Sequence, residues 1–513
     1  MSEMSPEMQE LLVITPVLLA LGGGVLAALI ASFVSRPTAV LVAATALVAG
    51  AGVSAGTVYG LEANVLAYDV MIGGGGFSGT ATVIMALSAA ALLGGFAWFA
   101  RSPSGGLAAA LVALSTGAAV ALAQSLDLVF TLIALESLAL CAYALVAQAR
   151  TPRADEAAVK YVIQGSVATG LFLLGMAILV GLHGGGTSLL AIRSTFSGVP
   201  STPLAAAMAL VIAAFAYKLG AFPFHSWAPD AFETAPSPSA GYLAAAPKIA
   251  AVLAAFVISS ILFSGPEVPA WQLSWQMGSF PIVIDVPRIS ALWAVLATGS
   301  IVFGNLAALR QRSYGRMLAY SGIAQIGYAL IGLTVGERVV GITMLLLSAY
   351  GAAVLAAFLA AEVMRCTRPD WDGSISGMAG FGRSNPVTGV ALAVAMFSLT
   401  GIPLTAGFWG KLLVFGGAVG MEWEWLVIVA VLGSAVSFGY YGRVLKTIYF
   451  EDAPSSTSME TATAEENSEI IVSGREGRAA AVVTVVLALA ILAVGIAPLF
   501  VGIEFLQRFF VFG

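Results

Sequence analysis

Side chains that can carry or pass on a proton lie beside prolines in an apolar part of the sequence. Residues 214 to 230 read AFAYKLGAFPFHSWAPD, which contains Lys218, Pro223 and His225, and Lys248 follows directly after Pro247. A neutral imidazole can accept and release a proton near pH 7. Proline lacks the backbone N–H that a continuous helix needs. These residue types at this spacing indicate proton transfer beside an interrupted helix, although a single histidine is often a packing residue.

The composition is that of a membrane protein. The 513 residues are 59% hydrophobic and 10% charged, with a mean hydropathy of +0.96, whereas soluble domains are roughly 25% charged. Apolar stretches of about 20 residues, long enough to cross a bilayer, recur along the chain. We predict about fourteen transmembrane helices, at 11–33, 38–59, 79–98, 106–125, 128–149, 158–182, 202–222, 239–264, 288–309, 317–334, 340–363, 386–416, 425–449 and 479–502.

Several other classes of protein are disfavoured by the sequence. The first apolar segment follows MSEMSPEMQE, which is acidic rather than basic, so we do not expect a cleaved signal peptide. Cys141 and Cys366 lie too far apart for a disulfide framework or a metal site. No dinucleotide-binding or haem motif occurs in the sequence. A net charge of −5 argues against nucleic-acid binding. We therefore expect no cofactor and no metal in this chain.

The basic residues predict the orientation of the fourteen helices, because cytoplasmic loops are enriched in lysine and arginine. With the N-terminus outside, four basic residues fall in outside segments: Arg193, Arg288, Arg338 and Arg508. Those in inside loops are Arg36, Arg101, Arg150, Arg153, Lys160, Arg310, Arg312, Arg316, Arg365, Arg368, Arg383, Arg443, Lys446, Arg475 and Arg478. Both termini are therefore predicted to face outward.

The remaining lysines, Lys218, Lys248 and Lys411, fall inside predicted helices. A charge within a membrane costs several kcal/mol, so such residues are candidates for function. The alternative is that a lysine near a helix end extends its amine to the headgroups. That alternative does not suit Lys248, which lies about 13 Å into its helix.

Glu136, in LIALESLALCAYAL, is the acidic residue nearest the middle of a predicted helix. A lone buried carboxylate tends to gain a proton and a lone buried lysine tends to lose one, but a pair restores both charges. A Glu136–Lys218 pair is the arrangement that avoids leaving either charge unpaired. Such a pair could release a proton when its partners separate. The alternative is a static tie between helices.

Prolines indicate interrupted helices and an internal repeat. Pro223, Pro247 and Pro403 lie in or just after apolar runs. LGAFPF (219–224) matches LTGIPL (399–404) at an offset of 180, and a lysine lies near each. Interrupted helices in inverted repeats are typical of transporters with ion sites near the membrane midplane. We predict an all-α polytopic membrane protein with two inverted five-helix repeats that contain broken helices.

Four segments resemble the antiporter-like subunit N family of bacterial respiratory complex I. They are EAAVKYVIQGSVATGLFLLGMAILVG (156–181), KLGAFPFHSWAPDAFETAPSPSAGYLAAAPKIAA (218–251), GNLAALRQRSYGRMLAYSGIAQIGYALIGL (304–333) and SLTGIPLTAGFWGKLLVF (398–415). The resemblance extends from about residue 126 to 450. Sister subunits M and L and the Mrp cation/proton antiporters share the core but differ around these positions.

The resemblance implies roles for particular residues. Glu136 would be the glutamate of the fifth helix and Lys218 the lysine of the broken seventh helix. His225 and Lys248 would connect them along a central polar axis. Lys411 would release protons outward from the twelfth helix, where a lysine fits subunits N and L and a glutamate fits subunit M.

The predicted organisation has five parts. Helices 1–3 occupy 1–105, the first antiporter-like repeat 106–264, the second repeat 265–450, a flexible acidic cytoplasmic loop 451–478, and helix 14 the segment 479–513. The long loop has no apolar periodicity, and the glycine-rich stretch MIGGGGFSGTATV (71–83) matches nothing in the family.

We predict a proton-translocating membrane subunit of a NADH:quinone oxidoreductase in a bacterial cytoplasmic (inner) membrane. Protons would enter from the inside near Lys218 and leave through Lys411. Redox chemistry would occur in other subunits, which would hold flavin and iron–sulfur clusters, and the partners would include sister antiporter-like subunits and the lipid bilayer. The alternatives are a Mrp-type cation/proton antiporter subunit and a purely structural scaffold.

Overall fold

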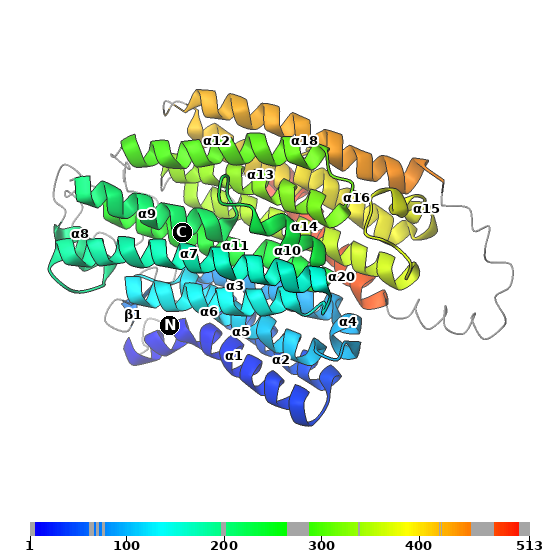
Figure 1. Ribbon diagram of the computed structural model, residues 1–513, viewed down its shortest axis with the longest axis horizontal. Helices are drawn as coiled ribbons and strands as arrows, with labels where there is room; N and C mark the ends of the chain where they lie inside the picture. Colours follow the sequence, from blue (N-terminus) through cyan, green and yellow to red (C-terminus); the bar gives the residue numbers. More distant parts are fainter. Residues whose placement is uncertain are drawn as a thin grey trace.

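A computed structural model describes residues 6–60, 66–67, 71–73, 77–195, 202–263, 287–336, 339–419, 421, 423–452 and 477–501. Its long helices run side by side as one bundle (Figure 1). The helices are α1 (Pro6–Phe33), α2 (Arg36–Gly60), α3 (Ser78–Gly94), α4 (Phe96–Arg101), α5 (Gly105–Ala123), α6 (Leu128–Ala147), α7 (Pro152–His183), α8 (Leu189–Thr195), α9 (Thr202–Leu219), α10 (Trp227–Thr234), α11 (Ser237–Phe263), α12 (Pro287–Leu309), α13 (Tyr314–Val335), α14 (Val340–Thr367), η3 (Ser376–Met378), α15 (Phe381–Ser384), α16 (Pro386–Thr400), α17 (Ala406–Ala418), α18 (Glu424–Phe450) and α20 (Arg478–Val501).

The helices confirm the predicted all-α membrane fold. Twelve described helices are long and apolar enough to cross a membrane, and α3 and α16 are shorter apolar helices. One small β pair joins β1 (Leu66–Ala67) to β2 (Ile72–Gly73) in antiparallel register. Helix α1 begins, and α20 ends, at the same end of the bundle (Figure 1).

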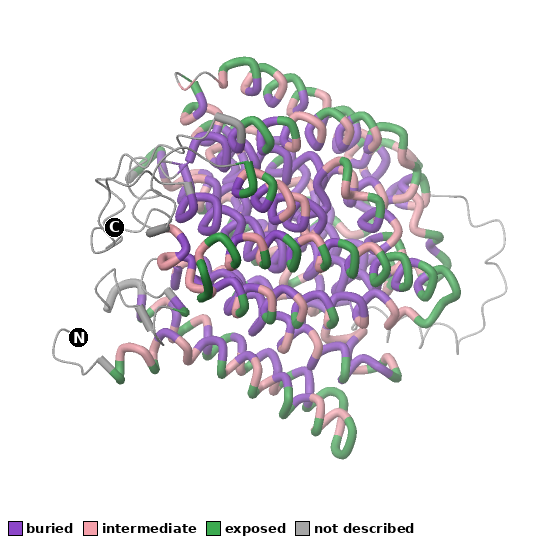
Figure 2. Tube along the Cα trace, turned by 60° about the vertical axis from the view of Figure 1, so that its left-hand side comes forward, coloured by how far each residue is buried: buried purple, intermediate pink, exposed green. Residues whose placement is uncertain are grey.

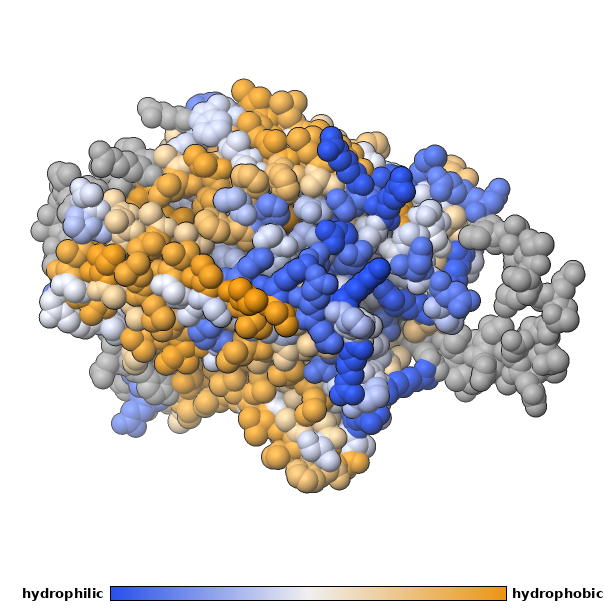
Figure 3. All heavy atoms as spheres, in the orientation of Figure 1, coloured by the Kyte–Doolittle hydropathy of each residue, from blue (hydrophilic) through white to orange (hydrophobic). Residues whose placement is uncertain are grey.

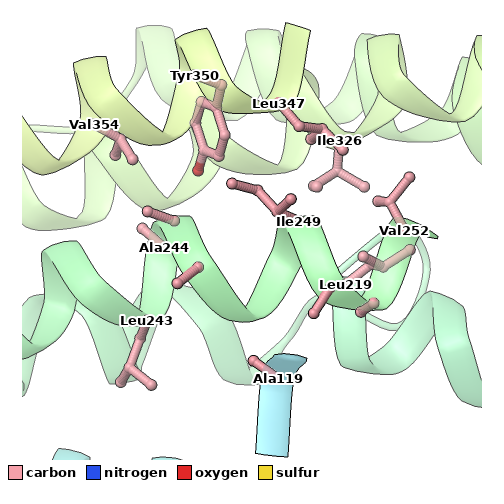
Figure 4. Packing of buried hydrophobic residues seen from close by; sticks show 14 of the residues in the cluster. Ala119, Leu219, Leu243, Ala244, Ile249, Val252, Ile326, Leu347, Tyr350 and Val354 are labelled. Atoms are coloured by element: carbon pink, nitrogen blue, oxygen red, sulfur yellow. The ribbon is translucent and has the colours of Figure 1, made fainter. Parts of the chain in front are cut away.

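Burial separates an inner group of helices from an outer ring. The most apolar windows of α11, α13 and α14 are 100%, 94% and 83% buried, whereas those of α7 and α18 are 28% buried. Figure 2 shows the buried centre and the exposed outer turns. Because apolar side chains gain nothing by leaving lipid tails, close packing holds such bundles together. Figure 4 shows this packing where Ile249 and Val252 of α11 lie between Leu219 and Ile326.

The two ends of the bundle differ in polarity. Helix α7 begins at one end, after Arg150, with Thr151 accepting a hydrogen bond from the N–H of Ala154. Hydrophilic residues gather towards that end, and apolar residues cover most of the rest of the face in Figure 3. That end corresponds to the inside in the predicted orientation.

Two helices are interrupted, as predicted. Helix α9 ends at Leu219, Gly220 takes a φ of +69°, and the chain passes Pro223 before α10 begins at Trp227. Helix α16 ends at Thr400, Gly401 takes a φ of +90°, and α17 begins at Ala406 after Pro403. Left-handed glycine is a common helix stop. The breaks occur in the fourth helix of each predicted set of five.

The predicted break at Pro247 is wrong. Pro247 lies inside α11, which is continuous from Ser237 to Phe263. The proline ring deprives the Leu243 carbonyl of its usual N–H donor, but a membrane helix tolerates this where neighbouring helices hold it. The most apolar window of α11 is fully buried in the bundle, so packing keeps the helix intact.

Parts of several sequence predictions lie outside the described residues. They are residues 453–476 of the loop 451–478, residues 74–76 of the glycine-rich stretch 71–83, the last residues of the predicted helices 239–264 and 479–502, and Arg338, Arg475 and Arg508 of the orientation prediction. The division into five parts remains a prediction.

Candidate functional site

Glu136 and Lys218 meet between α6 and α9. The Lys218 amine donates to Oε1 of Glu136 at 3.1 Å, and Lys218 is the more buried partner, with 7% of its side chain exposed against 32% for Glu136. The hydroxyl of Thr169 on α7 donates to the same oxygen at 2.6 Å. The pairing proposed from sequence is therefore formed. Thr169 was missed, since a threonine in an apolar helix usually bonds to its own backbone.

The helix break beside Lys218 is held by side chains. The backbone carbonyl of Tyr217 accepts a hydrogen bond from the indole N–H of Trp227, at 3.0 Å. Past the break, the N–H of Phe222 donates to the hydroxyl of Ser300 on α12, at 2.9 Å. These bonds satisfy backbone groups that a continuous helix would pair internally, which is a condition for a break at membrane depth. They hold the backbone on both sides of the break, next to Lys218.

His225 lies among aromatic rings rather than among charges. Its ring centroid is 4.4 Å from that of Phe303 and 5.6 Å from that of Phe222. Its Nδ1 is buried and has no hydrogen-bond partner among the described residues. The described interactions of Lys218 and Lys248 do not include His225. The relay role of His225 therefore stays a prediction.

Lys248 occupies the centre of the bundle, with 2% of its surface exposed. Among the described residues, its amine has no hydrogen-bond acceptor. Its nitrogen lies 5.3 Å from the ring centroid of Phe232 and 5.9 Å from that of Tyr350, within the range of cation–π attraction. Tyr350 projects its hydroxyl from α14 towards α11 (Figure 4). Gly322 leaves the space in which these groups meet, since a Cβ there would lie 3.3 Å from the amine.

Lys411 lies at the second helix break and is 3% exposed. Its amine donates to the carbonyls of Leu399 and Thr400, at 2.9 and 3.0 Å, and to the hydroxyl of Ser434 at 3.2 Å. The two carbonyls are available because α16 ends at Thr400 and Pro403 supplies no N–H. Among the described residues, Lys411 is therefore held by two backbone carbonyls and a hydroxyl and not by a carboxylate.

Uncharged polar groups that sequence reasoning missed extend this site. The amide of Gln325 on α13 donates to the Leu399 carbonyl at 2.6 Å. The amide of Asn305 on α12 donates to the Tyr328 hydroxyl and its oxygen accepts from Tyr440. The ring of Tyr328 lies 4.6 Å from the Lys411 amine. The signal in the sequence that could have indicated these groups is the presence of an asparagine or glutamine side chain within an apolar helix.

A further charged cluster links the first broken helix to its neighbours. Asp230 on α10 accepts hydrogen bonds from Arg316 at 2.7 Å and Lys160 at 3.2 Å. Arg316 also pairs with Glu233 at 3.1 Å, and Lys160 with Glu156 at 2.7 Å. Lys160, one of the basic residues assigned to inside loops, is thus ion-paired with two carboxylates. The cluster fixes α10 against α7 and α13.

Within the described residues, no group of three or more histidines, cysteines or carboxylates could hold a metal ion. The site therefore consists of two lysines at helix breaks, a third lysine between aromatic rings, one intramembrane carboxylate and a set of amides and hydroxyls. Such groups can take up, hold and release protons.

Comparison with known families identifies the chain. A model of the family described as "NADH:quinone oxidoreductase/Mrp antiporter, TM" matches residues 125–437, which include every lysine of the site. The chain belongs to this family.

Curated members of this antiporter family with similar sequences carry the name NADH-quinone oxidoreductase subunit N. That of Xanthomonas euvesicatoria pv. vesicatoria is 36% identical over 377 residues, which is 72% of this chain and 73% of the relative. That of Trichlorobacter lovleyi is 33% identical over 368 residues, 71% of each chain. That of Sphingopyxis alaskensis is 36% identical over 336 residues, 64% of this chain and 66% of the relative. The matched part of the chain thus spans about two thirds or more of these relatives.

Solved structures show the same antiporter-like architecture. A chain of respiratory complex I from Thermus thermophilus with bound aureothin is 27% identical and has a TM-score of 0.69, with 95% of this chain and 98% of that chain covered. A chain of the Mrp complex from Dietzia sp. DQ12-45-1b has a TM-score of 0.78 at 20% identity, with coverage of 98% and 99%. At that identity the Mrp likeness shows the fold alone.

Proposed function

We propose that this chain is the antiporter-like subunit N of a bacterial NADH:quinone oxidoreductase and that it relays protons across the membrane. Its family and the names of its relatives support this assignment. The observation that carries the relay is the Glu136–Lys218 ion pair, formed beside a helix break and between predicted membrane spans.

The pair can act as a gate. While Glu136 accepts from both Lys218 and Thr169, the ammonium and the carboxylate stabilise each other. If Glu136 moves away, Lys218 loses its counter-ion in a site that is 7% exposed, and its proton becomes easier to release. Because α9 ends one residue later, Lys218 can shift without breaking a continuous helix.

Lys248 and Lys411 provide two further proton-holding positions towards the second half of the bundle. Lys411 is held by carbonyl and hydroxyl oxygens, which accept hydrogen bonds from an ammonium, and it has no counter-ion within the described part of the chain. A group held in this way can release its proton without a carboxylate competing for it. We assign Lys411 to the exit towards the outside, and His225 to the connection past the first break.

The remaining assignments follow from the same proposal. The chain lies in a bacterial cytoplasmic membrane with both termini outside, and its partners are other membrane subunits of the complex, including sister antiporter-like chains. Flavin, iron–sulfur clusters and the quinone belong to other subunits, so the work of this chain is electrostatic.

Two experiments test the proposal. A tagged chain, purified in mild detergent from its native membrane, should co-elute with flavin, iron–sulfur clusters and inhibitor-sensitive NADH:quinone activity. In proteoliposomes of that complex, Lys218→Ala and Glu136→Ala should lower proton pumping and coupled turnover at least fivefold while the complex still assembles. Normal pumping by a fully assembled Lys218→Ala complex would contradict the proposed proton relay.

A Mrp-type cation/proton antiporter is the second candidate, because the Mrp chain shares the fold. In that case the purified chain would bring antiporter-like membrane subunits without redox centres, and vesicles would exchange Na⁺ or K⁺ for protons. A structural scaffold would tolerate apolar replacements at all three lysines.

A further inference from the structure

A cavity of about 410 Å³ opens at the end of the bundle where α7 begins. It lies between α10, the start of α11, α14 and the segment that follows α14, and Phe232, Phe358, Glu362 and Arg365 line it. In the proposed orientation this end faces the inside compartment. Glu362 is a buried carboxyl group in that cavity, 6% exposed, and the function proposed above does not use it.

Glu362 has no hydrogen-bond or ion-pair partner among the residues that the structure describes, which distinguishes it from the other acids of the cavity. Glu233 is paired with Arg316 at 3.1 Å. Hydrogen bonds from the hydroxyl and the backbone N–H of Ser374 hold the pKa of Asp372 below its ordinary value, so Asp372 stays ionised near neutral pH. Glu362 is thus the acid of this cavity that is free to change its protonation state.

Two other titratable groups around the cavity, Arg365 and Tyr314, have partners of their own. Arg365 donates to the hydroxyl of Ser237 at 3.3 Å and lies over the ring of Trp371. The hydroxyl of Tyr314 donates to the carbonyl of Ala357 at 3.0 Å. Arg153, at the start of α7, also lines the cavity. The guanidinium of Arg365 attracts an anionic Glu362, although the two form no ion pair within the described structure.

The cavity and Lys248 both lie next to the ring of Phe232, and Lys248 is not among the residues that line the cavity. Phe232 lines the cavity, and the Lys248 amine lies 5.3 Å from the centroid of that ring. Phe358, one turn before Glu362 on α14, completes the wall, with its ring centroid 6.4 Å from that of Phe232. Lys248 is 2% exposed, so Phe232 adjoins both a buried amine and a space that opens to the surface.

We infer, on the basis of the proposed relay, that Glu362 takes up protons from the inside compartment and passes them to Lys248 when the ring of Phe232 turns aside. A hydronium ion in the cavity gives its proton to the Glu362 carboxylate, which becomes a neutral acid. The acid then transfers the proton, through water admitted past Phe232, to the amine of Lys248, and the carboxylate is restored. The entry point is then Glu362, rather than the region of Lys218 expected from sequence.

The first test compares Glu362→Gln, Glu362→Asp and Asp370→Asn in the whole complex in proteoliposomes. Asp370 is an exposed carboxylate at the same end of the protein and serves as the matched control. We expect Glu362→Gln to lower proton uptake from the inside at least fivefold and to remove its dependence on inside pH. Glu362→Asp should regain at least half of the uptake, and Asp370→Asn should stay within twofold of the parent.

The outcomes separate this inference from the proposed function. If Lys411→Ala is defective but Glu362→Gln pumps with the parent's pH dependence, the entry at Glu362 is wrong and the relay stands. If Lys218→Ala and Lys411→Ala pump normally as well, the proposed function itself is wrong.

A labelling experiment tests the cavity without relying on pumping. With Cys141 and Cys366 replaced by serine, Thr234→Cys places a thiol on the cavity wall. A membrane-impermeant maleimide should label it in inside-out vesicles and not in right-side-out vesicles. Lys248→Cys should stay unlabelled unless Phe232→Ala is present. The absence of labelling at residue 234, or equal labelling of Lys248→Cys with and without Phe232, would overturn the inference.

Discussion

The amine of Lys411 and the amide of Gln325 donate hydrogen bonds to the same acceptor, the carbonyl oxygen of Leu399, at 2.9 and 2.6 Å. The acceptor exists because α16 ends one residue later and Pro403 offers no N–H. A backbone oxygen freed by a helix break thus joins α13 to the buried lysine of α17. The position of Lys411 depends on Gln325 as well as on the break.

Gln325→Leu should therefore impair the relay at Lys411. Removing a hydrogen bond within a buried polar network costs about 1–3 kcal/mol, so we expect proton pumping to fall about fivefold or more. Gln325→Glu, which cannot donate to a carbonyl when ionised, should be at least as defective. Proton pumping and NADH:quinone turnover of the reconstituted complex measure the effect. Normal pumping by a Gln325→Leu complex would show that Gln325 has no role in the relay.

Pro247, inside α11, and Pro403, at the second helix break, should respond differently to substitution by alanine. Pro403→Ala supplies an N–H that competes with Lys411 for the Leu399 carbonyl, and we expect pumping to fall at least fivefold. Pro247→Ala supplies an N–H that bonds Leu243 within an already continuous helix, so pumping should stay within twofold of the parent. The reverse pattern in matched, fully assembled complexes would contradict the helix geometry at both positions.

The fold could be predicted from hydropathy because the bilayer fixes the length of each crossing. The pairing of Glu136 with Lys218 could be predicted because unpaired charges are costly in the membrane. Residue type alone could not distinguish Pro247 from Pro223, since the surrounding packing decides whether a helix without one hydrogen bond stays continuous. Pro247 is enclosed by buried neighbours, whereas Pro223 follows a left-handed glycine.

The partners of Lys411 were beyond sequence reasoning for a physical reason. Its acceptors are backbone carbonyls, which every residue carries and which no residue type marks. Glu362 was missed because the predicted helix ended at residue 363, next to it, whereas α14 continues to Thr367 and Glu362 is buried. An acid at the end of an apolar run gives no sign of whether it faces solvent or a cavity.

Thr169→Val should weaken the hold on Glu136. The substitution keeps the side-chain shape but removes the 2.6 Å hydrogen bond to Oε1, which Lys218 also uses. The loss of a hydrogen bond to a charged group costs about 1.5–3 kcal/mol. We therefore expect a weaker Glu136–Lys218 gate and a roughly tenfold loss of proton pumping. The control is Thr298→Val, because the Thr298 hydroxyl bonds only to its own helix, at Ala294, among the described residues. Equal pumping by the two variants would show that Thr169 has no part in the gate.

The Asp230 cluster should contribute to stability more than a surface ion pair does. Asp230→Asn leaves Arg316 and Lys160 without a shared carboxylate at a half-buried position, and we expect a loss of about 1–3 kcal/mol. Asp452→Asn removes the partner of Arg383, but Asp452 is 95% exposed, and such pairs contribute about 0–1 kcal/mol. Thermal melting of the two purified complexes measures the difference, and equal melting temperatures would contradict it.

Gly322→Ala should disturb the centre of the relay through size alone. A Cβ at residue 322 would lie 2.7 Å from the Tyr350 hydroxyl and 3.3 Å from the Lys248 amine, so one of these groups must move. Overpacking of this kind costs about 1–3 kcal/mol, and we expect pumping to fall at least fivefold in a complex that still assembles. The control is Gly181→Ala in α7, where an added Cβ meets no atom within 4 Å of the described structure; it should pump within twofold of the parent. If Gly322→Ala pumps like Gly181→Ala, the close approach of Lys248 and Tyr350 is not needed for proton transfer. If pumping falls and the double variant Gly322→Ala with Tyr350→Phe recovers it, then the displaced group is the Tyr350 hydroxyl, and Lys248 itself keeps its place.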